Sequence, residues 1–394
     1  MMKNTFSLTS ILRPHILNLT PYSSARDEYT GTEGVFLDAN ENPLGPAFRE
    51  LMPDHLKASA RDVNRYPDPH QWAIKNRLAS IKGVRQEQIF LGNGSDEPID
   101  LLVRAICTPG TDEILIMPPT YGMYEVSARI NDVVVTKVPL TPDFQVDLPA
   151  VLAAINNKTK LIWLCSPNNP SGNRLQTDAI QAILEAASHS LVIVDEAYSD
   201  FSEEPSWAGK LDSYPNLVVL QTFSKAWGMA GLRLGMCFAS EELIRVLNRI
   251  KPPYNISAPS QALALEALEH EADKDEMVRE ILSERQFLTH NLRTLPSVLV
   301  IHPSDANFLL VQFTDASRTF AQLIEHKVIV RDRSNVTRCA GCLRITVGTR
   351  AENERLLDVL KRIADSPDAD IASLKALPVG TGDSVTKPEF VSNA

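Results

Sequence analysis

Six short apolar runs, separated by segments with helical spacing, constrain the fold of this chain most strongly. The runs are Glu113–Met117, Val133–Val135, Leu161–Cys165, Leu191–Val194, Leu217–Leu220 and Leu234–Phe238. Helical spacing predicts helices over Trp72–Ile81, Ile99–Ile106 and Glu241–Ile250, and it continues through Ser260–Leu292. Short apolar runs that alternate with helices are typical of buried parallel strands covered on both faces. The sequence therefore predicts an α/β domain.

The length of 394 residues is sufficient for two domains, and 44% hydrophobic with 22% charged residues is an ordinary globular composition. We expect an N-terminal arm over 1–35 and a large domain over 36–255, whose first residues contribute to a smaller domain. A linking helix and the small C-terminal domain are expected over 256–375. Residues 376–394 are rich in Gly, Ser, Thr and Pro, which favours disorder.

The charge distribution excludes several classes of partner. The formal net charge is -10, and no stripe of Lys and Arg offers a surface for nucleic acid or for anionic lipid. The first residues lack the apolar core of a secretory signal, and no stretch approaches the ~20 apolar residues of a membrane span. We therefore expect a cytoplasmic protein with no nucleic-acid or membrane partner.

The five cysteines predict no metal site. Cys107, Cys165 and Cys237 lie in apolar runs and are interpreted as small buried hydrophobic residues. Cys339 and Cys342 form a lone Cys-x-x-Cys, whereas a zinc site needs two more ligands at matching spacing. This pair is interpreted as part of a turn before a strand.

A lysine and an aspartate follow two of the predicted strands. Lys225 lies in the segment Thr222–Arg233, and Asp195 follows the run Leu191–Val194. A lysine that forms a Schiff base with pyridoxal phosphate needs a phosphate-binding cradle and an acid that keeps the pyridine nitrogen charged. Ser224 and Arg233 suit the cradle, and Asp195 suits the acid. Taken alone, Asp195 is better explained as a helix N-cap, which is common at strand-to-helix turns.

Further polar residues follow other strands. The glycine loop Gly92–Pro98 precedes a helix, whose free N–H groups attract a dianion, although many such loops are plain turns. Tyr121 can stack on a planar ring, although it is by default a half-buried tyrosine. Asn169 can donate to a phenolate, although the same residues also suit a proline-rich turn. Tyr198 lies one turn beyond Asp195. The carboxyl ends of parallel strands meet at one edge, so these side chains should converge.

Together these residues resemble the fold-type I pyridoxal-phosphate aminotransferases, and among them the histidinol-phosphate aminotransferase family, over nearly the whole chain. The resemblance implies a mostly parallel seven-stranded sheet flanked by helices, a smaller α+β domain and an N-terminal arm. It implies that Lys225, Asp195 and Tyr198 are catalytic, with Asn169 at the phenolic oxygen and Tyr121 on the ring. It places around the phosphate Gly94, Ser95, Asp96, Glu97, Thr222, Ser224 and Arg233. Tyr66 would reach the cofactor of a neighbouring subunit, which implies a homodimer with shared active sites.

The resemblance also implies the substrates. It suggests conversion of L-histidinol phosphate and 2-oxoglutarate to imidazole acetol phosphate and L-glutamate by a ping-pong mechanism. Tyr22 and Asn42 would contact the substrate, Arg344 would hold the glutamate carboxylate, and Arg331 would hold the substrate phosphate. Guanidinium groups suit both anions, although most arginines form surface ion pairs instead.

Three other functions remain compatible with parts of the sequence. Related enzymes with the same lysine and aspartate transaminate aromatic amino acids or decarboxylate a phosphorylated amino acid. Some transcription regulators carry an aminotransferase-like domain as a ligand sensor, but they need a basic DNA-binding module ahead of it. Here the strand pattern starts soon after residue 70, and the preceding arm is not basic.

Overall fold

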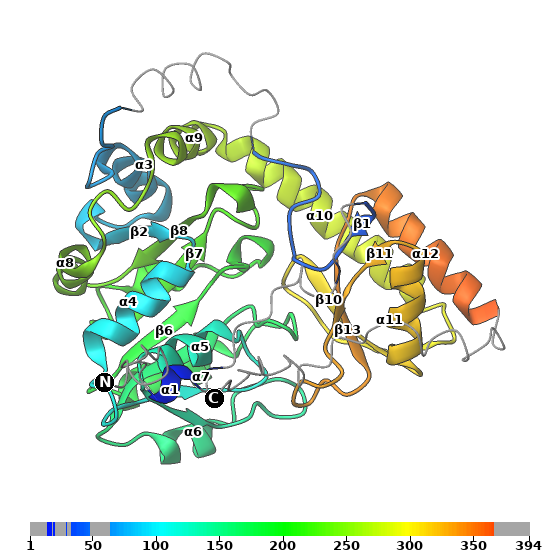
Figure 1. Cartoon of the computed structure of the whole chain (residues 1–394), viewed down its shortest axis with the longest axis horizontal. Helices are drawn as coiled ribbons and strands as arrows, with labels where there is room; N and C mark the ends of the chain where they lie inside the picture. The colour runs from blue at the N-terminus through cyan, green and yellow to red at the C-terminus, as the bar shows by residue number, and fades with distance from the viewer. Residues whose placement is uncertain (1–13, 18, 20–28, 30–32, 48–63, 366–394) are drawn as a thin grey trace, which may run out of the picture.

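The computed structural model describes residues 14–17, 19, 29, 33–47 and 64–365 of the chain, and its centre is a seven-stranded sheet (Figure 1). The strand order is β2 (Ile89–Asn93), β8 (Leu234–Phe238), β7 (Leu217–Thr222), β6 (Leu191–Asp195), β5 (Thr159–Cys165), β3 (Glu113–Ile116) and β4 (Val134–Lys137). Strand β8 is antiparallel to both of its neighbours, whereas all other neighbours are parallel. The predicted α/β class and the mostly parallel sheet are confirmed.

Helices cover both faces of this sheet because successive strand residues point to opposite sides. On one face Trp163 packs in a core with residues of α4 (Asp96–Ile106), α5 (Met123–Ile130) and α8 (Glu241–Ile250). On the other face its neighbours Ile162 and Leu164 pack with helices α3 (Trp72–Lys82), α6 (Leu148–Ala154), α7 (Thr177–Ala186) and α9 (Ala258–Glu269). Both faces of β5 are therefore dry, which explains its unbroken apolar run.

A second, antiparallel sheet lies beside the first. Its order is β12 (Arg331–Asp332), β13 (Cys342–Thr346), β10 (Phe308–Phe313) and β9 (Val298–Ile301). Its core is shared with α10 (Glu271–Leu292), α11 (Ala316–Glu325) and α12 (Arg350–Asp365). Figure 1 shows α10 leading from the large sheet to this smaller part. Strand β1 (Val35–Phe36) pairs with β11 (Val328–Ile329), so the chain crosses between the two parts near its beginning. The domain boundaries at 35/36 and 255/256 stay predictions.

Short elements complete the described residues: helix α1 (Pro14–Leu17) and single 3-10 turns at Gln86–Gln88, Ser199–Phe201, Trp207–Lys210 and Ala230–Leu232. Among the described helices none is long and apolar enough to cross a bilayer. The described residues also contain no cluster of three His, Cys, Asp or Glu side chains placed to hold a metal ion. Cys339 and Cys342 are buried free thiols, and Cys342 opens β13.

Two elements differ from expectation. The helical stretch expected over Ser260–Leu292 is two helices, α9 and α10, because His270 between them leaves the helical conformation at φ -104, ψ 36. Strand β2 was not predicted, since its apolar residues are only three long and run directly into Gly92 and Asn93. Its end matters for the site, because β2 delivers the glycine loop to the same edge as the parallel strands.

Candidate active site

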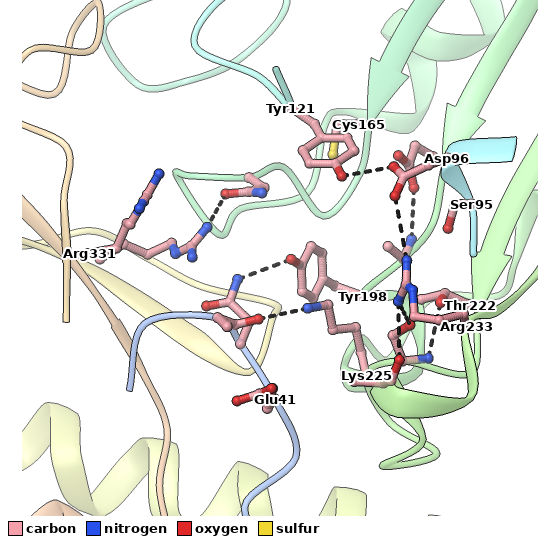
Figure 2. Close-up of a pocket in the computed structure, with 18 of the residues that line it drawn as sticks. Glu41, Ser95, Asp96, Tyr121, Cys165, Tyr198, Thr222, Lys225, Arg233 and Arg331 are labelled. Atoms are coloured by element: carbon pink, nitrogen blue, oxygen red, sulfur yellow. Dashed lines mark hydrogen bonds and ion pairs between the residues drawn. The ribbon is translucent and has the colours of Figure 1, made fainter. Parts of the chain in front are cut away.

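A cavity of about 290 Å³ lies at the carboxyl edge of the large sheet, where it faces the smaller sheet (Figure 2). Twelve of the side chains that the sequence suggested line it. One half consists of Ser95, Asp96, Tyr121, Thr222, Ser224 and Arg233. The other half consists of Asn169, Asp195, Tyr198, Lys225, Arg331 and Arg344. The expected convergence of strand ends is therefore present, because β3, β5, β6 and β7 are parallel and end at one edge.

Lys225 follows β7 and reaches into the middle of the cavity (Figure 2). Its Nζ donates to the carbonyl of Ala39 at 2.8 Å and lies 5.8 Å from the centroid of the Tyr198 ring. Burial, assisted by the positive charge of Arg344, lowers the pKa of Lys225 to about 8. A substantial fraction of the amine is therefore neutral near pH 8, as a nucleophile or a proton acceptor requires.

Asp195 is the last residue of β6 and is 2% exposed. Its Oδ1 accepts from the N–H of Ala197 at 3.1 Å, and its Oδ2 accepts from the hydroxyl of Tyr124 at 2.6 Å. Burial raises the pKa of Asp195 to about 6, while these two hydrogen bonds oppose the rise. The carboxylate is thus ionised at neutral pH yet held in low-dielectric surroundings, where pairing with a cation is strong.

Tyr124 is a functional candidate that the sequence argument missed. It is fully buried, its ring stacks on Trp163 at 4.7 Å, and it meets Tyr121 edge-on at 5.6 Å. Its position three residues after Tyr121 was the available signal, although Tyr121 itself precedes α5. In the sequence, however, it is indistinguishable from a core tyrosine.

The glycine loop and the start of α4 form an anion cradle with Arg233. Gly94 has φ +67, a conformation that favours glycine, and a Cβ there would displace the terminal nitrogen of Arg233, which lies 2.6 Å away. The guanidinium of Arg233 donates to the hydroxyl of Ser224 at 3.4 Å and lies 3.5 Å from Asp96. The first N–H groups of α4 point out of the helix beside it, which suits a phosphate.

Gly94 and Glu97 shape this loop and do not line the cavity. Glu97 Oε2 accepts from the backbone N–H of Asn93 at 2.6 Å and from the side chain of Asn255 at 3.1 Å. The loop is therefore fastened to the segment after α8. It presents Ser95 and Asp96 to the cavity, whereas Glu97 bonds to Asn93 and Asn255.

Arginines form a second positive region on the side of the smaller sheet, and Figure 2 shows Arg331 across the cavity from Arg233. Arg331 and Arg344 are direct partners on β12 and β13, and each is only 4% exposed. Arg344 donates to Asn169 Oδ1 at 2.7 Å and to the carbonyl of Asp38 at 2.5 Å. Like charges directly opposite one another in a sheet are unfavourable, so two buried arginines in this register are suited to an anion between the parts.

Arg333 also lines the cavity, two residues beyond Arg331. It was not singled out from the sequence, although the spacing of two that places both side chains on one side of an extended segment was visible in Arg331-Asp332-Arg333. Asn40 and Glu41 line the cavity as well and were likewise not predicted.

Two predicted residues of the described part of the chain lie elsewhere. Asn42 stabilises its own loop, donating to the carbonyl of Ala226 at 3.0 Å and accepting from the N–H of Leu44 at 2.9 Å. Tyr66 is 80% exposed and stacks on Tyr254 at 4.3 Å. Tyr22 lies outside the described residues.

Comparisons with protein families, with individual proteins and with solved structures all match this chain to aminotransferases. The family model of class I and II aminotransferases matches residues 32–360. The histidinol-phosphate aminotransferase of Cytophaga hutchinsonii is 58% identical over 356 residues, covering 90% of this chain and 99% of the relative. That of Parabacteroides distasonis is 51% identical over the same shares of both chains. A histidinol-phosphate aminotransferase structure from Sinorhizobium meliloti, in complex with pyridoxal-5'-phosphate, matches with a TM-score of 0.80 at 24% identity, covering 92% and 99% of the two chains. The chain belongs to the class I and II aminotransferase family.

Proposed function

We propose that this chain is a pyridoxal-phosphate-dependent aminotransferase of L-histidine biosynthesis. It transfers the amino group of L-histidinol phosphate to 2-oxoglutarate, which gives imidazole acetol phosphate and L-glutamate. The observation that carries the proposal is one cavity that contains Lys225, Asp195 and two separate arginine regions. The relatives at 58% and 51% identity, whose printed name is histidinol-phosphate aminotransferase, support the same reaction.

The residues present fit the cofactor. The cradle of Ser95, Thr222, Ser224 and Arg233 suits its phosphate, and the left-handed conformation of Gly94 sets the turn that leads into it. Asp195 would hold the pyridine nitrogen, Tyr121 would cover the ring, and Asn169 and Tyr198 would meet the phenolic oxygen. When bound, pyridoxal phosphate supplies the electron sink for the pair released when a substrate C–H bond loses its proton.

Lys225 is proposed to hold the cofactor and to move the proton. Its pKa of about 8 leaves the amine able to accept a proton from the substrate carbon and to return it to a neighbouring carbon. The carbonyl of Ala39, 2.8 Å from Nζ, orients the amine toward the cavity centre while it is free. The Lys225 amine lies over the face of the Tyr198 ring, and an aromatic face attracts a positive charge. The amine can therefore change its protonation state there without repulsion from the ring.

The two positive regions can bind two different anions, the phosphate of the cofactor and the anionic group of the substrate. The cradle with Arg233 takes the cofactor phosphate, which leaves Arg331, Arg333 and Arg344 for the substrate. A phosphate dianion needs more positive charge than one carboxylate, and three guanidinium groups can supply several bidentate contacts. Arg344 is proposed to hold the carboxylate of glutamate, and Arg331 with Arg333 the phosphate of histidinol phosphate.

The active site is proposed to be shared within a homodimer. Tyr66 and Tyr254 form a stacked aromatic pair that is 80% and 39% exposed, which is unusual for side chains of this size. A partner subunit would cover them and would bring Tyr66 to the neighbouring cofactor phosphate. Tyr22 is proposed to reach the partner's substrate in the same way. A cytoplasmic location belongs to the same proposal, because both substrates are charged metabolites.

A spectral titration tests this function. The purified protein, loaded with pyridoxal phosphate, would be mixed with histidinol phosphate, and the visible absorption of the cofactor followed. We expect the absorption to disappear without release of carbon dioxide and to return on addition of 2-oxoglutarate. Phenylalanine and threonine phosphate serve as competing donors. A faster reaction with phenylalanine would favour an aromatic aminotransferase, and carbon dioxide from threonine phosphate would favour a decarboxylase.

The Lys225→Ala variant is the matched control for this titration. It should bind the cofactor without forming a covalent bond and should show no turnover. Persistent turnover would exclude Lys225 from the chemistry. The remaining alternative, a ligand-sensing regulator, predicts no turnover of any amino donor by the unmodified protein.

A further inference from the structure

The hydroxyl of Tyr198 is held by a residue that nothing above assigns to the reaction. Asn40 Nδ2 lies 3.0 Å from the Tyr198 oxygen, and both side chains are buried. Asn40 adopts φ +53, a left-handed conformation that asparagine tolerates better than most residues. Its carbonyl accepts from Asn307 Nδ2 at 3.1 Å, so the backbone at this point is fixed as well.

The orientation of the Asn40 amide follows from its bonds to Thr346. The backbone N–H of Asn40 can only donate, and it donates to Thr346 Oγ1 at 3.0 Å. Among the described residues, Asn40 Oδ1 is the one acceptor within reach of the Thr346 hydroxyl proton, and this bond is also 3.0 Å long. The amide oxygen is therefore turned toward Thr346, and the amide nitrogen is turned toward Tyr198.

This order fixes the direction of the last bond. Asn40 Nδ2 can only donate, so the Tyr198 oxygen accepts from it and must send its own proton elsewhere. Within the described part of the chain, the Tyr198 hydroxyl donates to no protein acceptor, while Tyr198 itself lines the cavity. The Tyr198 hydroxyl can therefore donate its proton only to a group inside the cavity.

We propose that Asn40 and Thr346 form a hydrogen-bond relay that makes Tyr198 a proton donor into the cavity. Asn40 and Thr346 are positioning residues, since they act on the cofactor through Tyr198. The relay rests on the proposed contact of Tyr198 with the phenolic oxygen. It deepens that proposal by explaining why the tyrosine meets this oxygen as a donor and never as an acceptor.

The surroundings of Tyr198 favour the protonated hydroxyl that the relay requires. Burial raises the pKa of Tyr198 to about 12, with Arg344 and the bond from Asn40 opposing the rise. Asp195 and Cys165 add to the rise, and the Lys225 amine lies 5.8 Å from the ring. The ring meets Phe308 edge-on at 5.1 Å, which limits its rotation away from Asn40.

The relay also joins the two sheets. Thr346 lies two residues after Arg344 on β13, so both side chains leave the strand on the same face. Arg344 contacts Asn169 and Thr346 contacts Asn40, which in turn contacts Tyr198. One strand of the smaller sheet therefore orients both candidate ligands of the phenolic oxygen.

The test compares variants of the loaded protein by a spectral pH titration. A proton donated to the phenolic oxygen withdraws electron density and lowers the pH at which the lysine-bound cofactor loses its own proton. Thr346→Val leaves the Asn40 amide free to turn over, so we expect the midpoint of the visible absorption change to rise by about half a pH unit. Asn40→Asp can no longer donate and should raise the midpoint as well. Thr346→Ser keeps the hydroxyl and should titrate like the unchanged protein.

Two controls make the outcome decisive. Thr319→Val removes another buried threonine hydroxyl, one in α11 that donates to the backbone carbonyl of Asp315 at 2.7 Å, and should leave the midpoint unchanged. Tyr198→Phe should raise the midpoint, and adding Thr346→Val to it should cause no further change. If Tyr198→Phe leaves the midpoint unchanged, the proposed contact of Tyr198 is wrong. If it raises the midpoint but Thr346→Val does not, the contact stands and the relay is refuted.

Discussion

The hydroxyl of Tyr124 donates to Asp195 Oδ2 at 2.6 Å, although the two residues are 71 positions apart in the sequence. Tyr124 is held by its stack on Trp163, and Asp195 is held by the backbone N–H of Ala197 on its other oxygen. Both carboxylate oxygens are thus fixed before any ligand arrives. Because its orientation is already fixed, the Asp195 carboxylate loses little entropy when it pairs with a cationic ring nitrogen.

Replacing Tyr124 with phenylalanine should weaken cofactor binding by roughly tenfold or more, because a hydrogen bond to a charged group contributes about 1.5 kcal/mol or more. The ring and its stack on Trp163 remain, so the change removes the hydroxyl alone. The dissociation constant of pyridoxal phosphate would be measured by equilibrium titration of the cofactor-free protein.

A cofactor analogue with carbon in place of the ring nitrogen separates this effect from a general loosening of the site. Tyr124→Phe should weaken pyridoxal phosphate more than the analogue, because only the former pairs with Asp195. Tyr214→Phe, in the half-buried ring beside Trp207, is the matched control. Equal weakening of both ligands would contradict the role assigned to Tyr124.

The buried Asp195 should make the cofactor-free protein less stable at neutral than at mildly acidic pH. The pKa of Asp195 is raised from 3.8 to about 6 in the folded state, so the folded protein binds this proton more tightly than the unfolded chain. Its contribution to stability therefore grows as the pH falls through 6, by about 1 kcal/mol between pH 7.5 and pH 5.

Urea unfolding of the cofactor-free protein at these two pH values would measure the effect. Asp195→Asn lacks the titrating group. The free energy of unfolding of the original protein, minus that of the variant, should therefore increase by about 1 kcal/mol as the pH falls from 7.5 to 5. The comparison cancels the contributions of the other carboxylates. A difference that does not change with pH would exclude the raised pKa.

The pKa of Lys225 predicts how fast the cofactor is captured. Only the neutral amine attacks the aldehyde, so the rate at which cofactor-free protein takes up pyridoxal phosphate should rise with pH around a midpoint near 8, the pKa of Lys225. Because the charge of Arg344 contributes to the lowering, Arg344→Gln should move this midpoint to higher pH. Stopped-flow absorbance would record the capture. A midpoint above 10 in the original protein would place Lys225 in water-like surroundings.

The α/β class, most strands of the large sheet and the strand-end residues could be predicted from the sequence, because they follow from local patterns. Short apolar runs specify buried strands, and a polar residue directly after a run is delivered to one edge by the parallel arrangement. Asp195, Lys225, Asn169 and Tyr121 could be named for this reason. Their convergence needed no knowledge of side-chain contacts.

The residues that orient these groups could not be predicted, because their partners are distant in sequence. Asn40 forms a hydrogen bond with Thr346, 306 positions away in the sequence. Asn40 lines the cavity and Asn42 does not, and Asn40 is the one of the two with a left-handed backbone conformation. Tyr124 has the spacing of an ordinary core residue. Such contacts are set by how the smaller sheet packs against the larger one, which no local pattern specifies.

Arg333 should discriminate between the two amino donors. It lines the cavity two residues beyond Arg331, on the side proposed for the substrate phosphate. Losing one charged contact to a phosphate costs about 1.5 to 3 kcal/mol, so Arg333→Gln should lower kcat/KM for histidinol phosphate by roughly tenfold to a hundredfold. Glutamate has no phosphate, and its half-reaction should change by less than about threefold. Single-turnover kinetics with each donor would measure both values. Arg338→Gln, an exposed arginine of the same connection, is the matched control. Equal losses with both donors would show that Arg333 supports the site as a whole and does not select the phosphorylated substrate.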